Sequence, residues 1–146
     1  MTETLRTLQL FYAGALSDAA FHYGRNGIME TVTAEKKKLQ EEAAPGQLRH
    51  LGITDLKSAY TVLGGIFGCA NWNLASEEGC VKAETSGCML CAIAKKQGSP
   101  KPCYPFCINP FSSYARVFGY ELQVEETLWE GKKCIFVNTR KEENDK

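Results

Sequence analysis

The spacing of apolar residues changes about halfway along this chain of 146 residues, and that change limits the folds it can adopt. Up to about residue 68, apolar side chains recur every three or four positions, which is typical of amphipathic helices. Beyond that point they alternate in short runs between turn residues, which is typical of β-strands. We therefore expect an α+β fold, with N-terminal helices packed on an antiparallel sheet built from two hairpins.

The positions of glycine and proline set the expected boundaries of these elements. The expected helices cover 4–23, 28–42, 54–67, 88–96 and 111–118. The expected strands cover 70–76, 80–86, 120–128 and 134–139. Pro45 and Gly46 predict a loop at 43–50, and the prolines of 97–110 exclude one regular element there.

The length of the chain predicts one domain over residues 1–146. We expect a helical part at about 1–68, a sheet and cysteine-rich part at about 69–139 and a charged tail at 140–146. Seventeen basic and seventeen acidic residues cancel, which argues against a nucleic-acid-binding surface. We see neither an apolar run long enough to span a membrane nor a secretory leader, so we expect a cytoplasmic protein without membrane partners. A homodimer through the first helix is expected, because Gly14 and the alanines of that helix permit close packing.

Seven cysteines are many for a cytosolic chain of this length, and their odd number argues against a disulfide scaffold. Cys88 and Cys91 form a C-x2-C pair, and after eleven residues Cys103 and Cys107 form a C-x3-C pair. Two chelating pairs at short reach are what a tetrahedral zinc site or an iron–sulfur cluster needs. Two other interpretations remain open, namely reactive thiols without a metal and small apolar side chains in a core. Further ligands could come from Cys69, Cys80 and Cys134.

Glu126 is the acidic residue most open to a chemical role. By period two it shares a strand face with Leu122 and Val124, where a carboxylate is costly to bury unless it is paired. It could act as a ligand, as a general base or as a partner for a basic substrate, and a bulge that turns it to solvent is the structural alternative. With Cys107 or Cys91 as the nucleophile, the candidate catalytic pair is Cys107 and Glu126.

Two aromatic residues are candidates for the wall of a substrate pocket. Trp72 alternates with Leu74 in the first predicted strand, so its side chain should face the core or a pocket. Tyr104 lies next to Cys103, where its ring could shield the second cysteine pair from water.

The C-terminal run VEETLWEGKKCIFV resembles the closing hairpin of the L-2-amino-thiazoline-4-carboxylic acid hydrolase-like family, through Thr127, Gly131, Cys134 and Phe136. The order FGCANWN and GCMLCAIAKK…CYPFC is similar to cysteine-bearing members of that family. The same hairpin, and the order of helices before sheet, also resemble 4-vinyl reductase small-molecule-binding domains. The resemblance covers roughly residues 60–138. The first family implies hydrolysis of C–N bonds beside a thiol, and the second implies an enclosed pocket for a hydrophobic ligand, sometimes beside zinc.

The chain departs from the zinc-bearing members of the second family, which place an acidic residue and a cysteine just before the last cysteine. Aligned on Cys134, those positions hold Gln123 and Glu126 here. Any metal is therefore expected at Cys88, Cys91, Cys103 and Cys107. The expected function is a cysteine-rich small-molecule pocket of hydrolase-like type. The alternatives are a non-enzymatic ligand-binding or metal-binding sensor domain, with zinc or an iron–sulfur cluster, and an interaction module whose cysteines only pack.

Overall fold

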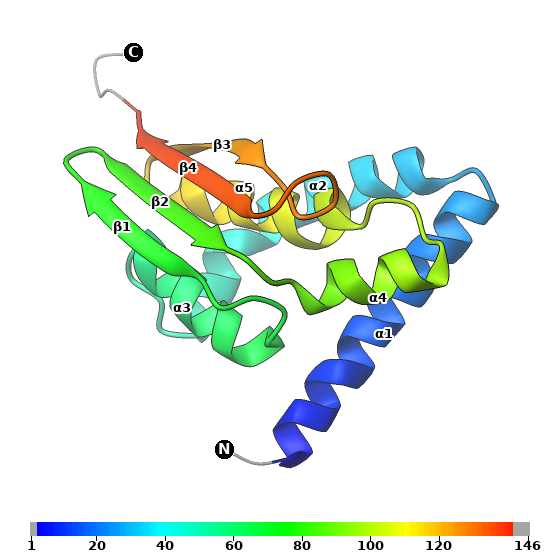
Figure 1. The fold of residues 1–146 in the computed structure, drawn as a ribbon. Helices are drawn as coiled ribbons and strands as arrows, with labels where there is room; N and C mark the ends of the chain where they lie inside the picture. Colours follow the sequence, from blue (N-terminus) through cyan, green and yellow to red (C-terminus); the bar gives the residue numbers. More distant parts are fainter. Residues whose placement is uncertain (1–2, 142–146) are drawn as a thin grey trace.

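The computed structural model describes residues 3–141, in which three helices precede the first hairpin (Figure 1). The helices are α1 (Glu3–Arg25), α2 (Met29–His50) and α3 (Leu56–Phe67). After them come β1 (Asn73–Glu77), β2 (Cys80–Thr85), α4 (Met89–Gln97), the π-helix η1 (Tyr104–Ile108), α5 (Asn109–Val117), β3 (Tyr120–Glu126) and β4 (Cys134–Arg140).

The four strands form one antiparallel sheet in the order β1-β2-β4-β3. Each hairpin contributes two neighbouring strands, and the pairing of β2 with β4 joins them, from Cys80 opposite Thr139 to Thr85 opposite Cys134. Alternate side chains of β2 and β4 are buried against the helices, while those between them are more exposed. The predicted α+β fold, with helices packed on a sheet of two hairpins, is confirmed.

An aromatic cluster joins the helices to the sheet. Tyr60 of α3 stacks on Phe111 of α5, with ring centroids 4.2 Å apart and planes 4° from parallel. Trp72 lies edge-on to Tyr60 at 5.2 Å, and Phe136 of β4 lies 5.0 Å from Trp72. Tyr60 and Phe136 are almost fully buried, so this cluster fixes the position of α3 and α5 over the sheet.

One buried polar contact sets how α3 sits over the centre of the sheet. Asn138 Nδ2 of β4 donates to the Tyr60 hydroxyl at 3.0 Å and to the Val81 carbonyl of β2 at 3.2 Å. Burial raises the pKa of the Tyr60 phenol, so it stays neutral and can accept this hydrogen bond. Because the contact joins α3, β2 and β4, a slipped sheet register would leave buried polar groups unpaired.

The predicted loop at 43–50 is wrong, because α2 continues through Pro45 to His50. The residues around the proline are held by tertiary packing, since Ala44 and Leu48 are buried and the side-chain Oε1 of Gln47 accepts from the Tyr114 hydroxyl at 2.9 Å. Proline removes one helical N–H, but the burial of this helix face against α5 outweighs that local preference.

The small residues of α1 pack inside this chain. Ala13 and Ala20 are fully buried, and α1 lies against α4 (Figure 1). Other residues of the helix are exposed, with Leu8 at 62% and Phe11 at 72% of their possible exposure. A homodimer through α1 stays a prediction, and its contact face would be this apolar one.

Two further expectations concern membranes and the end of the chain. Within residues 3–141, the helices are too short or too polar to cross a membrane. The predicted charged tail began at residue 140, but β4 includes Arg140, and residues 142–146 lie outside the described part of the chain.

The Tyr60–Asn138 contact predicts a stability difference between two Tyr→Phe variants. Tyr60→Phe should lower the free energy of unfolding by about 1–3 kcal/mol, because a buried N–H of Asn138 loses its acceptor. Tyr120 accepts a hydrogen bond from Arg140 at an exposed site, so Tyr120→Phe should change stability by less than about 0.5 kcal/mol. Urea denaturation in reducing buffer measures both, and equal losses would contradict the role given to this contact.

Candidate functional site

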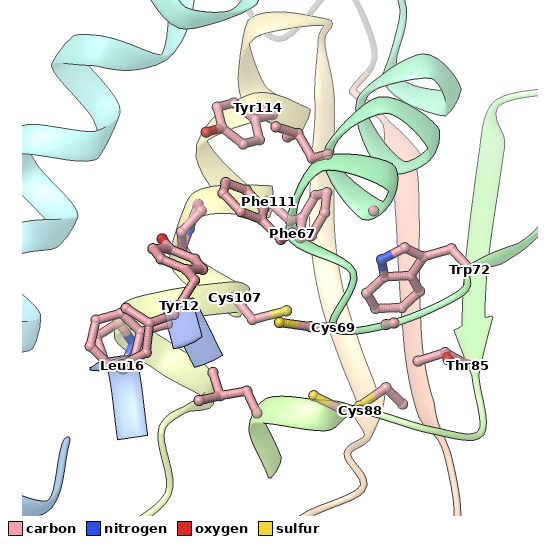
Figure 2. Close-up of a pocket in the computed structure, with 18 of the residues that line it drawn as sticks. Tyr12, Leu16, Phe67, Cys69, Trp72, Thr85, Cys88, Cys107, Phe111 and Tyr114 are labelled. Atoms are coloured by element: carbon pink, nitrogen blue, oxygen red, sulfur yellow. The ribbon is translucent and has the colours of Figure 1, made fainter. Parts of the chain in front are cut away.

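A cavity of about 260 Å³ opens between α1, α2, α3, α4 and the η1–α5 segment. Six aromatic side chains contribute to its wall, and Trp72 and Phe111 lie inside (Figure 2). Tyr12 of α1 and Phe67 of α3 also line it and stack on each other, with ring centroids 5.3 Å apart. Both of these rings are more than a third exposed, so they form the rim of the cavity, while Trp72 and Phe111 form its interior.

Few polar side chains reach this cavity. Gln40 of α2 donates through Nε2 to the Pro105 carbonyl at 2.9 Å, whereas its Oε1 is buried with no hydrogen-bond donor in the described part of the chain. Lys36 Nζ lies 5.4 Å from the centroid of the Phe106 ring. Among residues 3–141, neither a carboxylate nor an imidazole lines the cavity, so Lys36 is its only permanently charged group.

Sulfur atoms line the part of the cavity nearest the sheet. Cys69, Cys88, Cys107 and Cys134 contribute to the wall, and in Figure 2 the side chains of Cys69 and Cys107 point toward one another. Cys69 follows α3, Cys107 belongs to η1 and Cys134 begins β4, so the fold brings together thiols from distant segments.

A second cavity, of about 20 Å³, lies behind this wall. The cysteines that line it are Cys88, Cys91, Cys103, Cys107 and Cys134. Three of them also line the large cavity, so the thiols of Cys88, Cys107 and Cys134 stand between the two spaces. Cys80, in the first hairpin, lines neither cavity.

Local structure explains how the C-x2-C pair and the C-x3-C pair come to line the small cavity. Cys88 is the N-cap of α4, and its Sγ accepts a hydrogen bond from the Cys91 backbone N–H at 3.4 Å. Cys103 precedes η1 and Cys107 lies within it, so one wide helical turn brings both thiols to the same cavity. Cys134 Sγ accepts from the Leu128 N–H at 3.3 Å, which orients it toward the loop between β3 and β4.

Burial keeps these thiols neutral. It raises the pKa of Cys88 and of Cys103 to about 12, and neighbouring sulfur atoms add to the rise. The same cause raises the pKa of Cys69, Cys107 and Cys134. A neutral thiol is a poor nucleophile, so without a further partner these cysteines are chemically quiet near pH 7.

The predicted catalytic pair is not brought together in either cavity. Cys107 lines both, but Glu126 lines neither, and its Oε2 accepts from the backbone N–H groups of Lys132 and Lys133 at 2.7 and 3.0 Å. A register shift between Val124 and Glu126 precedes this turn. This bulge pairs Glu126 with Ile135, whereas Val124 pairs with Phe136, so Glu126 leaves the predicted face of Leu122 and Val124, and the structural alternative of a bulge applies. The carboxylate is half-buried, and the turn amides supply the partners that it needs.

The predicted pocket residues differ in position. Trp72 lines the large cavity, whereas Tyr104 is half exposed, lines neither cavity and has Lys101 Nζ 5.5 Å from its ring centroid. Sequence reasoning missed Phe111 and Tyr114, which α5 directs into the same cavity. The inward alternation of β4 could have placed Cys134 there, but a link to α4 and η1 needs the tertiary fold.

The predicted metal ligands Cys88, Cys91, Cys103 and Cys107 all line the small cavity, together with Cys134. As their side chains lie, no three or more cysteine, histidine or acidic residues in the described range are close enough to hold a metal ion. The four predicted ligands are thus neighbours around one space, but as they lie they do not form a ready metal site.

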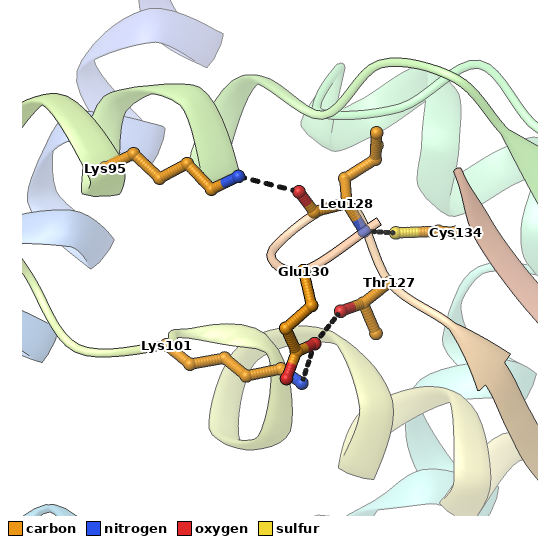
Figure 3. Close-up of polar contacts among 6 residues, drawn as sticks. All are labelled: Lys95, Lys101, Thr127, Leu128, Glu130 and Cys134. Atoms are coloured by element: carbon orange, nitrogen blue, oxygen red, sulfur yellow. Dashed lines mark hydrogen bonds and ion pairs between the residues drawn. The ribbon is translucent and has the colours of Figure 1, made fainter. Parts of the chain in front are cut away.

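The loop between β3 and β4 covers the small cavity, and two lysines hold it in place (Figure 3). Lys95 of α4 donates to the Leu128 carbonyl at 2.8 Å. Lys101 pairs with Glu130 at 2.9 Å, and the Thr127 hydroxyl donates to the same carboxylate at 2.8 Å. Thr127 and Leu128 themselves line the cavity, so this loop closes it from outside.

No family model, curated protein or solved structure that was compared with this chain matches it. The resemblance to the hydrolase-like family and to the vinyl reductase domains therefore stays a prediction.

The raised thiol pKa values predict an unusual pH dependence of alkylation. Burial disfavours the thiolate, so the iodoacetamide rate at Cys88 and Cys103 should keep rising about tenfold per pH unit from pH 8 to 10. In the urea-unfolded chain, the same rates should level off above about pH 9, because an ordinary cysteine has a pKa of about 8.5. Mass spectrometry of timed anaerobic digests measures both, and a plateau below pH 9 in the folded protein would show that these thiols are not shielded as described.

Proposed function

We propose that this protein is a binding domain for a small aromatic molecule, which occupies the large cavity. The observation that carries the proposal is the cavity of about 260 Å³, walled by aromatic rings and thiols and open at one rim. Ligand pockets are typically lined by apolar and aromatic side chains with a few placed polar groups, and this lining has that character.

The chemistry of the wall indicates the class of ligand. The volume is just below the roughly 300–1,000 Å³ of common ligand pockets, which favours a molecule of one or two rings. Trp72 and Phe111 offer ring surfaces for an aromatic body. The Gln40 side chain lines the cavity and its buried Oε1 lacks a donor, so a small rotation of the amide would let a ligand hydroxyl or N–H satisfy it.

Binding is better supported than hydrolysis. A thiol nucleophile needs a base or a lowered pKa, and burial raises the pKa of every thiol in this cavity. The lining described above includes neither carboxylate nor imidazole, and Glu126 is engaged by turn amides elsewhere. The non-enzymatic alternative from the sequence is therefore the one we propose.

A cavity-filling substitution tests where the ligand binds. Leu16 of α1 lines the cavity, so Leu16→Trp should weaken the binding of 2-naphthol at least about tenfold by occupying its space. Leu39→Trp is the matched control, because Leu39 is 64% exposed and lines neither cavity. Isothermal titration calorimetry of both variants and the wild type measures the change. Undetectable 2-naphthol binding to the wild type at millimolar concentration, or equal weakening by the two substitutions, would contradict the proposal.

The unpaired amide oxygen predicts a preference for hydrogen-bond donors. Gln40→Leu should weaken 2-naphthol binding about 2–10-fold, the value of one net hydrogen bond, and leave naphthalene binding nearly unchanged. Naphthalene is the matched ligand, since it has the same rings without the hydroxyl. If Gln40→Leu weakens both ligands equally, the loss comes from cavity shape and not from the proposed acceptor.

A further inference from the structure

The small cavity has the volume and the lining side chains that suit one bound metal ion. Its volume of about 20 Å³ exceeds the roughly 10–15 Å³ that a single water needs. A buried water also needs two to four good polar partners. Five of the ten residues that line this space are cysteines, whose thiols are weak donors and acceptors, and most of the others are apolar. Five thiols around such a space are far better partners for a thiophilic cation than for water.

We propose that the small cavity is a binding site for a single thiophilic d¹⁰ cation, Zn²⁺ in the first place, with Cys88, Cys103, Cys107 and Cys134 as its ligands. This set replaces Cys91 of the sequence prediction with Cys134 of β4. A metal bound by this set would link α4, η1 and β4. The two cysteine pairs predicted from the sequence would link only α4 and η1, which follow one another in the chain.

Position selects these four sulfur atoms first, since Cys88, Cys107 and Cys134 line both cavities and Cys103 lines the small one. Electrostatic interactions link every pair among Cys88, Cys103, Cys107 and Cys134. Cys91 interacts in the same way with Cys88, Cys103 and Cys134, but not with Cys107. Its backbone has another task, since the Cys91 N–H donates to the Cys88 sulfur.

Two features of the surroundings partly offset the burial that disfavours a ligand thiolate. Backbone N–H groups already point at the sulfur atoms of Cys88 and Cys134, and the first of these belongs to the N-terminus of α4. The positive charge of Lys101 interacts with Cys103 and Cys134. On binding, each of the four thiols loses its proton to solvent and the sulfur lone pair forms the metal bond, so no oxidant or reductant is required.

Binding must draw the sulfur atoms inward. Within residues 3–141, no three or more potential ligands are placed as they lie to hold a metal ion, whereas zinc–sulfur bonds are about 2.3 Å long. Rotation about χ1 moves a cysteine sulfur without moving its backbone, and the empty space between these side chains permits it. The same volume excludes a four-iron cluster, whose eight core atoms need far more than the space of about one water.

A cobalt titration of the full chain, purified without oxygen, tests the site. Co²⁺ should bind at about one ion per chain with sulfur-to-metal charge-transfer bands, and Zn²⁺ should displace it. Cys134→Ser and Cys103→Ser should each weaken binding at least about tenfold. Cys80→Ser is the matched control and should bind like the wild type, because Cys80 lines neither cavity. Cys91→Ser should also retain binding.

Three results would overturn the proposal: no charge-transfer band with the wild type, wild-type affinity in Cys134→Ser, or equal losses in Cys91→Ser and Cys134→Ser. If the serine variants do not fold, X-ray absorption spectroscopy of the zinc-loaded wild type decides. A shell of four sulfur atoms at about 2.3 Å supports the site, and a shell of nitrogen and oxygen overturns it. None of these measurements uses an aromatic ligand, so their outcome is independent of the proposed binding function.

Discussion

The contact of Tyr60 with Phe111 and Asn138 is the constraint on which the rest of the structure depends. The Tyr60 ring stacks on Phe111 of α5, and the Tyr60 hydroxyl accepts a hydrogen bond from Asn138 in the central strand β4. Aromatic stacking adds about 0.5–1.5 kcal/mol to area burial, and the buried hydrogen bond adds direction, so the helices lie over the sheet in one arrangement. Because Phe111 also lines the large cavity, a residue that fixes the core also forms part of the wall of that cavity.

Cysteine suits a wall between two cavities because it has two physical characters. When neutral it is a small apolar side chain that packs in a core, and when deprotonated it is a strong ligand for soft metals. Cys88, Cys107 and Cys134 show the first character as they lie, since burial keeps their protons on. A cation in the small cavity would change them to the second and would place a positive centre directly behind the wall of the large one.

Sequence periodicity predicted the helices and both hairpins because those signals are local. It failed at 43–50, where burial of Ala44 and Leu48 against other elements overrides the local effect of Pro45. The paired cysteines were predicted as neighbours from their spacing alone. Spacing alone could offer Cys69, Cys80 and Cys134 only as equal further candidates. Which of them lie beside the pairs depends on the pairing of β2 with β4 and on the packing of α3, both of which join residues far apart in the chain.

The distribution of charge around the small cavity explains how an ion could reach a covered site. Its permanent charges lie outside, where Lys95 and Lys101 hold the β3–β4 loop through the Leu128 carbonyl and Glu130. Such exposed contacts are weak, because water and salt compete for both partners. The pairing of β2 with β4 is unbroken up to Cys134, and the aromatic core packs against it, so the backbone of Cys134 can stay in place when the loop opens. Opening would release only the Cys134 sulfur from the Leu128 N–H. The weakest contacts of the region thus lie over the small cavity and the strongest ones lie beneath it.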